Sequence, residues 1–182
     1  MIIVKSPREI EFLREACRIP AGARPVARQA IAAGVATREI DREVHKFILR
    51  SGATTSFLNY GGFPASTCIS VNEEVVHGFP GARKVREGDI VSVDVGAKVH
   101  GFNGDCAGTY PCGEISEEAK RLIEVTRQSF FEGIKFARPG YRISDIGHAI
   151  QEYIERHGFA DERDYEGPGV GATLPADPAI PT

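Results

Sequence analysis

The chain has 182 residues, of which 42% are hydrophobic and 26% charged, and its formal net charge is −3. This balance is typical of a globular domain, so we expect a single domain over residues 1–182. The charge makes nucleic acid an unlikely partner, and the lack of a long apolar run excludes a membrane span. The four cysteines form no C-x-x-C pair, and no secretory signal is recognisable, so we expect free thiols, no structural zinc and a cytoplasmic location.

The N-terminal part of the chain is predicted to be helical. The run Ser6-Pro7-Arg8-Glu9 has the pattern of a capping box with proline at the first helical position. We expect Pro20 and Pro25 to break or kink the helix that follows. A second helix is predicted to have Thr37 as its N-cap. Its core face is expected to consist of Ile40, Val44, Phe47 and Ile48.

The middle of the chain is predicted to form strands. Residues 54 to 71 are rich in Thr, Phe, Tyr and Ser around a Gly61-Gly62 turn, which indicates a loop followed by a strand. Residues 90 to 95 contain alternating β-branched side chains bounded by glycines. A further strand is predicted from about Val99 to Cys106, and the short connection between the two makes them a hairpin.

The C-terminal part is predicted to contain two helices and an irregular tail. Ser116 is the expected N-cap of the first helix, whose apolar face consists of Leu122, Ile123, Phe130 and Ile134. Ser144 is the expected N-cap of the second. The tail from Glu166 holds four prolines and three glycines in seventeen residues and has no predicted element. Strands and helices in separate blocks indicate the α+β class.

Two aspartates on the predicted hairpin are the strongest candidates for chemistry. Asp94 lies between Val93 and Val95, a half-buried strand position where a carboxylate is costly without a cation or several hydrogen bonds. Asp105 follows eleven residues later on the neighbouring strand. Such carboxylates suit divalent ions like Mg, Mn, Fe, Co and Zn. The alternative is that both are hairpin-end aspartates bonded to backbone amides.

A histidine lies upstream of these aspartates. His77 precedes Gly78-Phe79-Pro80, a turn pattern, and a loop histidine there is a candidate hydrogen-bond or proton donor at neutral pH. The alternative is an ordinary surface histidine. We interpret the remaining histidines as structural or solvated; they are His45, His100, His148 and His157. No nucleophile-elbow or phosphate-loop pattern occurs, so covalent catalysis is not expected.

Several motifs together resemble the type I methionine aminopeptidases. They are Asn59-Tyr60-Gly61-Gly62-Phe63-Pro64, Thr67-Cys68-Ile69-Ser70-Val71-Asn72-Glu73, His77-Gly78-Phe79-Pro80, Asp94 and Asp105. The resemblance implies the pita-bread fold, an α+β architecture of two pseudo-symmetric halves. It also implies removal of the initiator methionine from nascent peptides that have a small second residue, with the ribosome as a further partner.

The resemblance also implies roles for individual residues. Asp94 would be a terminal metal ligand, and Asp105 would bridge two divalent ions, which in this family are Co, Mn, Fe or Zn. His77 would contact the substrate and stabilise the transition state. The methionine side chain would lie against Tyr60, Phe63 and Cys68, since apolar and sulfur surfaces suit a thioether.

The C-terminal motifs depart from the family pattern. Where the family has Gly-His-Gly with a metal-binding histidine, this chain has Gly167-Pro168-Gly169, and where the family has His-Glu-x-Pro it has Pro175-Ala176-Asp177-Pro178. We expect a C-terminally truncated member with an incomplete second half, which keeps only Asp94 and Asp105 as ligands. An unpaired sheet edge and an uncovered apolar face would then favour self-association.

Three interpretations of function therefore remain. The chain is a metal-dependent aminopeptidase, or an inactive relative that binds peptides or proteins, or a fragment without a role of its own. Metal content separates the first from the others, and peptide binding without turnover separates the second from the third.

Overall fold

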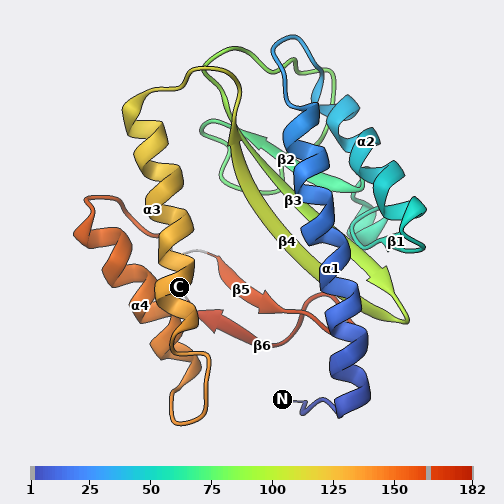
Figure 1. Cartoon of the computed structure of the whole chain (residues 1–182), viewed down its shortest axis with the longest axis vertical. Coiled ribbons are helices and arrows are strands. Elements are labelled where there is room, and N and C mark those ends of the chain that lie inside the picture. Colours follow the sequence, from blue (N-terminus) through green and yellow to red (C-terminus); the bar gives the residue numbers. More distant parts are fainter. Residues whose placement is uncertain (1–2, 163–164, 182) are drawn as a thin grey trace. The chain divides into compact units, whose positions relative to one another are not determined.

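The computed structural model describes residues 3–162 and 165–181. Its elements belong to two compact units, which are considered separately (Figure 1). The first along the chain comprises residues 4–115 and 170–174, and the second comprises mainly residues 116–169 and 175–181. Helices and antiparallel strands occur in separate blocks, as predicted for the α+β class. No helix among the described residues is long and apolar enough to cross a membrane.

The N-terminal helix α1 (Pro7–Ala30) begins as its sequence predicts. The Ser6 side chain accepts a hydrogen bond from Glu9 N at 3.3 Å, and the Glu9 carboxylate accepts one from Ser6 N at 2.7 Å. The predicted break at Pro20 and Pro25 is wrong, because α1 runs unbroken through both residues. Pro20 is buried, and α1 packs along the sheet, so tertiary contacts outweigh the backbone hydrogen bonds that the prolines remove.

Helix α2 (Thr37–Arg50) buries the predicted face, with Ile40, Val44 and Ile48 inaccessible to solvent. Its predicted cap is wrong by one residue. The N-cap is Ala36, whose N–H donates to the Glu39 carboxylate at 2.8 Å. Thr37 lies inside the helix and its hydroxyl instead bonds the backbone of Gly81, a long-range partner that a local pattern does not reveal.

A four-stranded antiparallel sheet positions the candidate site. Its strands are β1 (Thr54–Thr55), β2 (Thr67–Val71), β3 (Ile90–Val99) and β4 (Phe102–Pro111). Strand β3 pairs with all three of the others. The predicted hairpin is confirmed, with β3 and β4 in register from Ile90↔Pro111 to Val99↔Phe102. The predicted position of its turn, between Val95 and Val99, is wrong, because β3 continues through Val99. Its turn consists of His100 and Gly101, both with positive φ, as a two-residue hairpin requires.

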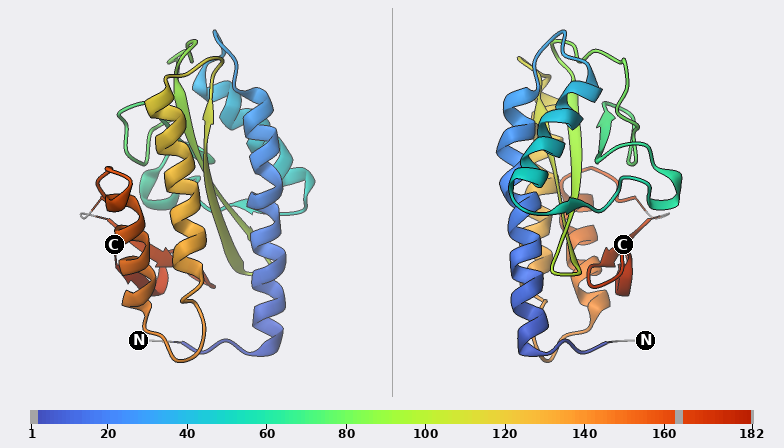
Figure 2. Two further views of the ribbon diagram at one scale, coloured as in Figure 1. Left: turned by 60° about the vertical axis from the view of Figure 1, so that its left-hand side comes forward. Right: turned by 90° about the vertical axis from the view of Figure 1, so that its right-hand side faces the viewer.

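Alternation along the strands separates a core face from a polar face. The odd-numbered residues of β2 and β3 enter the main core, together with the buried residues of α1 and α2; those strand residues are Ile69, Val71, Val91, Val93, Val95 and Ala97. Figure 2 shows α1 on one side of the hairpin and the segment around residues 57–80 on the other. The even-numbered positions of β3 therefore face the side that carries the candidate site.

The second unit contains α3 (Glu117–Ile134), α4 (Ile143–Arg156), β5 (Glu166–Gly169) and β6 (Ala176–Pro181). Ser116 caps α3 as predicted, whereas α4 begins two residues earlier than predicted, with Arg142 as N-cap rather than Ser144. The tail was predicted to have no element, but β5 and β6 pair antiparallel there. Their backbone hydrogen bonds form despite the glycines and prolines.

The apolar face predicted for α3 is wrong. Phe130 is 56% exposed and Ile134 is 50% exposed, and the buried positions are Val125, Ser129 and Gly133. A Cβ atom on Gly133 would lie 2.6 Å from Ile150 of α4, so the small residues allow the two helices to approach closely. Close approach of the helix backbones decides which face of α3 is buried.

Candidate metal centre

The two candidate carboxylates lie together on the polar face of the hairpin. Asp94 is opposite Ala107 and Asp105 is opposite Gly96, which makes the two aspartates diagonal neighbours on one face. Burial, together with the charge of Asp94 and the hydrogen bond between the two carboxyl groups, raises the pKa of Asp105 to about 8. Two half-buried carboxyl groups in contact must share a proton or bind a cation. This pair is therefore suited to a divalent ion.

Cys68 lies beside this pair. Cys68 is on β2, opposite Asp94 of β3, and is only 6% exposed. Burial, followed by the charges of Asp94, Asp105 and Asp41, raises the pKa of its thiol to about 12. The sulfur is therefore a neutral, apolar surface at pH 7 and not a thiolate ligand.

Asp41 of α2 fixes the start of β2, a role that the sequence pattern did not reveal. Its carboxylate accepts hydrogen bonds from Ser66 N at 3.0 Å, Thr67 N at 2.9 Å and Thr67 Oγ1 at 2.8 Å. His45, one turn later, bonds the Ser66 hydroxyl at 2.7 Å. These contacts span more than twenty residues, so no local pattern signals them. They hold the strand that carries Cys68.

A row of aromatic rings leads away from the carboxyl pair. A Cβ atom on Gly96 would lie 2.6 Å from the ring of Phe57, so this ring lies against the backbone of the residue that pairs with Asp105. The Phe57 and Phe63 centroids are 6.4 Å apart, and those of Phe63 and Phe79 are 5.2 Å apart, both edge to face. Tyr60 lies in the 3-10 turn η1 (Tyr60–Gly62) and is 53% exposed.

His77 lies in a turn that is held against β2. Its φ is +60°, and it is exposed. The next residue, Gly78, accepts a bond from Ile69 N at 2.9 Å and donates to Ser70 Oγ at 3.1 Å. A Cβ atom on Gly78 would lie 2.2 Å from the Ile69 carbonyl oxygen, so glycine is required there. The strand that carries Cys68 thus fixes the backbone beside His77.

Three of the other histidines are solvated or bonded to nearby groups. His100 pairs with Glu15 at 2.9 Å, the ring of His157 bonds the Tyr153 carbonyl at 2.7 Å, and His148 is exposed. Each is on a helix or turn, as predicted.

Asn103 connects the hairpin to the glycine-rich loop, and the sequence analysis missed this residue. Its side chain is buried, donates to the Gly171 carbonyl at 3.0 Å and accepts from Ser56 Oγ at 3.0 Å. Its backbone N–H donates to the same carbonyl at 2.8 Å. A buried amide with both ends bonded fixes the position of residues 170–174 relative to β4.

The two carboxyl groups could supply part of a metal centre. Within residues 3–162 and 165–181, no group of three or more His, Cys, Asp or Glu side chains is close enough to hold a metal ion. Pro168 on β5 is exposed and has no donor atom. Asp94 and Asp105 fit a hard divalent ion as two of its ligands, with water oxygens left to complete its coordination.

Comparison with known proteins gives the family. The metallopeptidase family M24 matches residues 11–182. Methionine aminopeptidase 1 of Bacillus subtilis is 49% identical over 181 residues, which cover all of this chain and 73% of the relative. The crystal structure of methionine aminopeptidase from Thermotoga maritima superposes with a TM-score of 0.96 at 45% identity, again over 100% of this chain and 73% of that one. Prolidase from Pyrococcus furiosus gives 0.87 at 25% identity, over 98% of this chain and 52% of that one.

The chain therefore belongs to the metallopeptidase family M24. Its relatives at 45–49% identity are methionine aminopeptidases, which are metal-dependent hydrolases. The expected resemblance and the pita-bread fold are confirmed.

Proposed function

We propose that this chain removes methionine from peptide N-termini, using a divalent metal ion held by Asp94 and Asp105. The single observation that carries the proposal is the contact between these two carboxyl groups on neighbouring strands. Identity of 49% to a methionine aminopeptidase supports the substrate class. We further propose that residues 1–182 act as one methionine-aminopeptidase-like domain.

Asp94 and Asp105 would hold the ion through carboxylate oxygens. A bound divalent ion supplies Lewis-acid polarisation of the scissile carbonyl and lowers the pKa of a coordinated water. Because Asp105 keeps a proton at neutral pH without a cation, the pair must lose that proton to bind one. Asp105 would be shared by two ions, as the family resemblance implies.

The methionine side chain would lie against Phe63, Cys68 and Tyr60. Cys68 supplies a buried neutral sulfur beside Asp94, and Phe63 is the middle ring of the aromatic row. Tyr60 is exposed in the turn between Phe57 and Phe63 and would cover the bound side chain from outside. Burial of a thioether among aromatic rings and sulfur gains both apolar area and sulfur–aromatic contacts.

His77 would act on the substrate as a hydrogen-bond donor. Its turn is fixed beside Cys68 by the two hydrogen bonds of Gly78. An imidazole there would orient the peptide carbonyl and stabilise the negative charge that develops on its oxygen. This role needs no change in the protonation of the ring, because a neutral imidazole also donates one hydrogen bond.

The finer assignments follow from the same family. We propose Co, Mn, Fe or Zn as the ion, nascent chains with a small second residue as substrates, the ribosome as a partner and the cytoplasm as the location.

We also propose self-association through the exposed side chains of α3, namely Leu122, Phe130, Phe131 and Ile134. A monodisperse monomer in size-exclusion chromatography with light scattering would exclude that last assignment.

A second candidate function is peptide binding without turnover. It is favoured by one observation, namely that no third acidic, histidine or cysteine side chain joins Asp94 and Asp105 among the described residues. The aromatic row and Cys68 would then bind a methionine-bearing N-terminus without cleaving it.

Release of methionine from a Met-Ala-Ser peptide tests both candidates. The chain is assayed with Co²⁺ or Mn²⁺, alongside Asp105→Ala and a charge-matched control, Glu118→Gln on the exposed surface of α3. Turnover that Asp105→Ala abolishes and Glu118→Gln preserves supports the aminopeptidase. Saturable peptide binding without turnover at any metal concentration supports the second candidate instead.

A further inference from the structure

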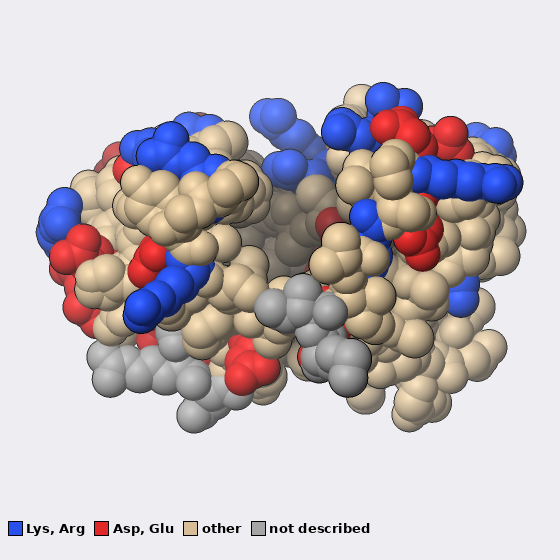
Figure 3. Space-filling view, turned by 90° about the horizontal axis from the view of Figure 1, so that it is seen from below, with Lys and Arg blue, Asp and Glu red and all other residues tan. Residues whose placement is uncertain are grey.

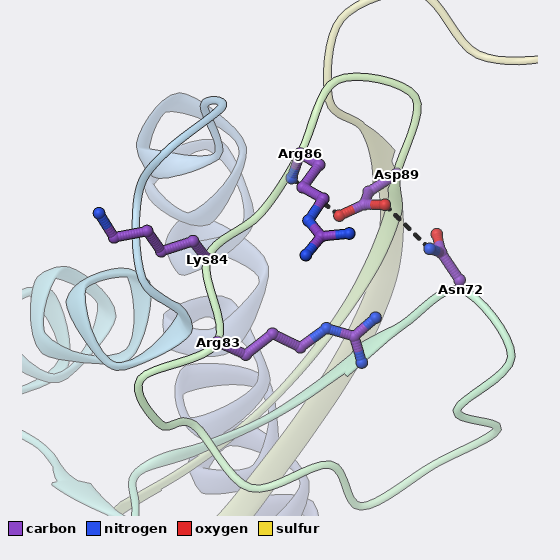
Figure 4. Close-up of a pocket in the computed structure, with 5 residues that line it drawn as sticks. All are labelled: Asn72, Arg83, Lys84, Arg86 and Asp89. Carbon is purple, nitrogen blue, oxygen red and sulfur yellow. Dashed lines mark hydrogen bonds between the residues drawn. The ribbon is translucent and has the colours of Figure 1, made fainter.

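A hollow lies on the surface where the end of β2 meets the segment that leads into β3 (Figure 4). Its volume is about 390 Å³, and its lining residues are Asn72, Arg83, Lys84, Arg86 and Asp89. None of them belongs to the carboxyl pair or to the aromatic row. The hollow is therefore a separate feature of the sheet-bearing unit.

The floor of the hollow is rigid. Asp89 is buried, and its two carboxylate oxygens accept hydrogen bonds from Asn72 Nδ2 at 2.9 Å and Arg86 N at 2.8 Å. The Asn72 side chain also accepts a bond from Ile90 N at 3.0 Å. The Asp89 charge is thus stabilised by fixed donors, which lowers its repulsion of an approaching anion.

The basic side chains extend from a backbone that is held in place. The carbonyl of Arg83 accepts a bond from Thr37 N at 2.9 Å, and the backbone of Val85 exchanges two bonds with residues 34 and 35, at 2.8 and 2.9 Å. Val85 itself is only 1% exposed. A fixed backbone reduces the ordering cost when the neighbouring side chains bind a ligand.

Two of the basic side chains around the hollow have no partner among residues 3–162 and 165–181. Arg83 pairs with Glu74 at 2.9 Å, whereas the side chains of Lys84 and Arg86 have no ion pair or hydrogen bond within the described part of the chain. The guanidinium of Arg86 thus lines the hollow without a partner among the described residues. Figure 3, in which the molecule is seen from below relative to Figure 1, shows Lys and Arg side chains next to Asp and Glu side chains on that face.

The direction of the side chains selects two of the three cations. Figure 4 shows the guanidinium groups of Arg83 and Arg86 pointing into the hollow toward Asn72 and Asp89, whereas Lys84 points away from them. Guanidinium groups form paired hydrogen bonds with phosphate oxygens, which an ammonium cannot do. The Asn72 amide stands on the opposite side of the same space.

We propose that this hollow binds a small phosphate-bearing anion between Arg83 and Arg86. A bound phosphate would supply Arg86 with the partner that it lacks. It also competes with Glu74 for Arg83. Free inorganic phosphate and a phosphate monoester share this chemistry, and the monoester alone can also use the rest of the hollow.

The test is a titration of the arginine Nε–H signals of the whole chain by two-dimensional NMR at low salt. Inorganic phosphate and glycerol phosphate are the two probes. The variants are Arg83→Gln and Arg86→Gln, with Arg18→Gln on the exposed side of α1 as the charge-matched control. Asp105→Asn removes any contribution from the carboxyl pair.

Saturable shifts in the wild type, Arg18→Gln and Asp105→Asn, with affinity weakened about tenfold or more in Arg86→Gln, support the site. Tighter binding of the monoester identifies the esterified group as the ligand, and equal binding identifies free phosphate. Equal affinities of Arg86→Gln and Arg18→Gln would overturn the proposal, because general charge attraction would then explain the binding. Absence of saturation up to about 20 mM phosphate would overturn it as well.

Discussion

Replacing Gly96 with alanine should damage the candidate site through the aromatic row. A Cβ atom there would lie 2.6 Å and 2.9 Å from two ring atoms of Phe57, whereas carbon atoms in contact prefer about 3.5–4.0 Å. The ring is only 9% exposed and must move by roughly 1 Å. Overpacking of this kind costs about 1–3 kcal/mol. For a chain of this size the melting temperature should fall by about 2–4 °C per kcal/mol.

Urea unfolding and peptide kinetics check this prediction. The matched control is Gly81→Ala, because the nearest atom to its added Cβ is 3.8 Å away and its φ is not positive; its stability should change by less than about 0.5 kcal/mol. The double variant Gly96→Ala, Phe57→Ala should lose less stability than the sum of the two single changes, since the space left by the ring accepts the new methyl group. Wild-type stability and KM in Gly96→Ala would refute the packing argument.

Three further predictions follow from the same contacts. Asn103→Ala should lower the free energy of unfolding by about 1–3 kcal/mol, and Asn103→Asp should lower it by more, because a carboxylate then faces the Gly171 carbonyl. Urea unfolding measures both losses as a shifted midpoint with an unchanged m-value. Equal losses of stability in the two variants would contradict this prediction. In EDTA, the free energy of unfolding should fall as pH rises from about 4 to about 8, by at most about 1.4 kcal/mol per pH unit, because the unfolded chain releases the proton that Asp105 keeps. The Asp105→Asn variant should lack this part of the pH dependence. An identical slope in the wild type and the variant would contradict the raised pKa. Phe79→Ala should raise KM for methionyl peptides about 2- to 12-fold at unchanged kcat, since it removes an edge-to-face contact with Phe63. Phe79→Leu should raise KM by a smaller factor. A fall in kcat alone would contradict this role of Phe79.

Local patterns predicted the parts of the fold that depend on neighbours in the sequence. The capping box of Ser6 and Glu9 closes within four residues, and the pairing of β3 with β4 needs only alternating side chains and a short connection, although the turn lies several residues later than predicted. The proximity of Asp94 and Asp105 follows from that hairpin, because diagonal positions on paired strands share a face.

Features that depend on distant partners could not be predicted in this way. The unbroken α1 at Pro20 is held by packing against the sheet, and the hydroxyl of Thr37 bonds Gly81 across 44 residues. The buried face of α3 follows Gly133, whose size matters only because Ile150 packs against it. Asp41 and Asn103 likewise act on backbone far away in the chain, at Thr67 and at Gly171.

The most direct test of the central claim is a calorimetric titration of the metal-free chain with Mn²⁺ at pH 7, repeated in two buffers of different ionisation enthalpy. The account predicts saturable binding to the wild type and to Glu118→Gln, with release of about one proton per ion, because Asp105 must lose its proton. Asp94→Asn and Asp105→Asn should each abolish both the binding and the proton release. Equal Mn²⁺ binding by wild type and Asp105→Asn would contradict the claim that this carboxyl pair is the metal centre.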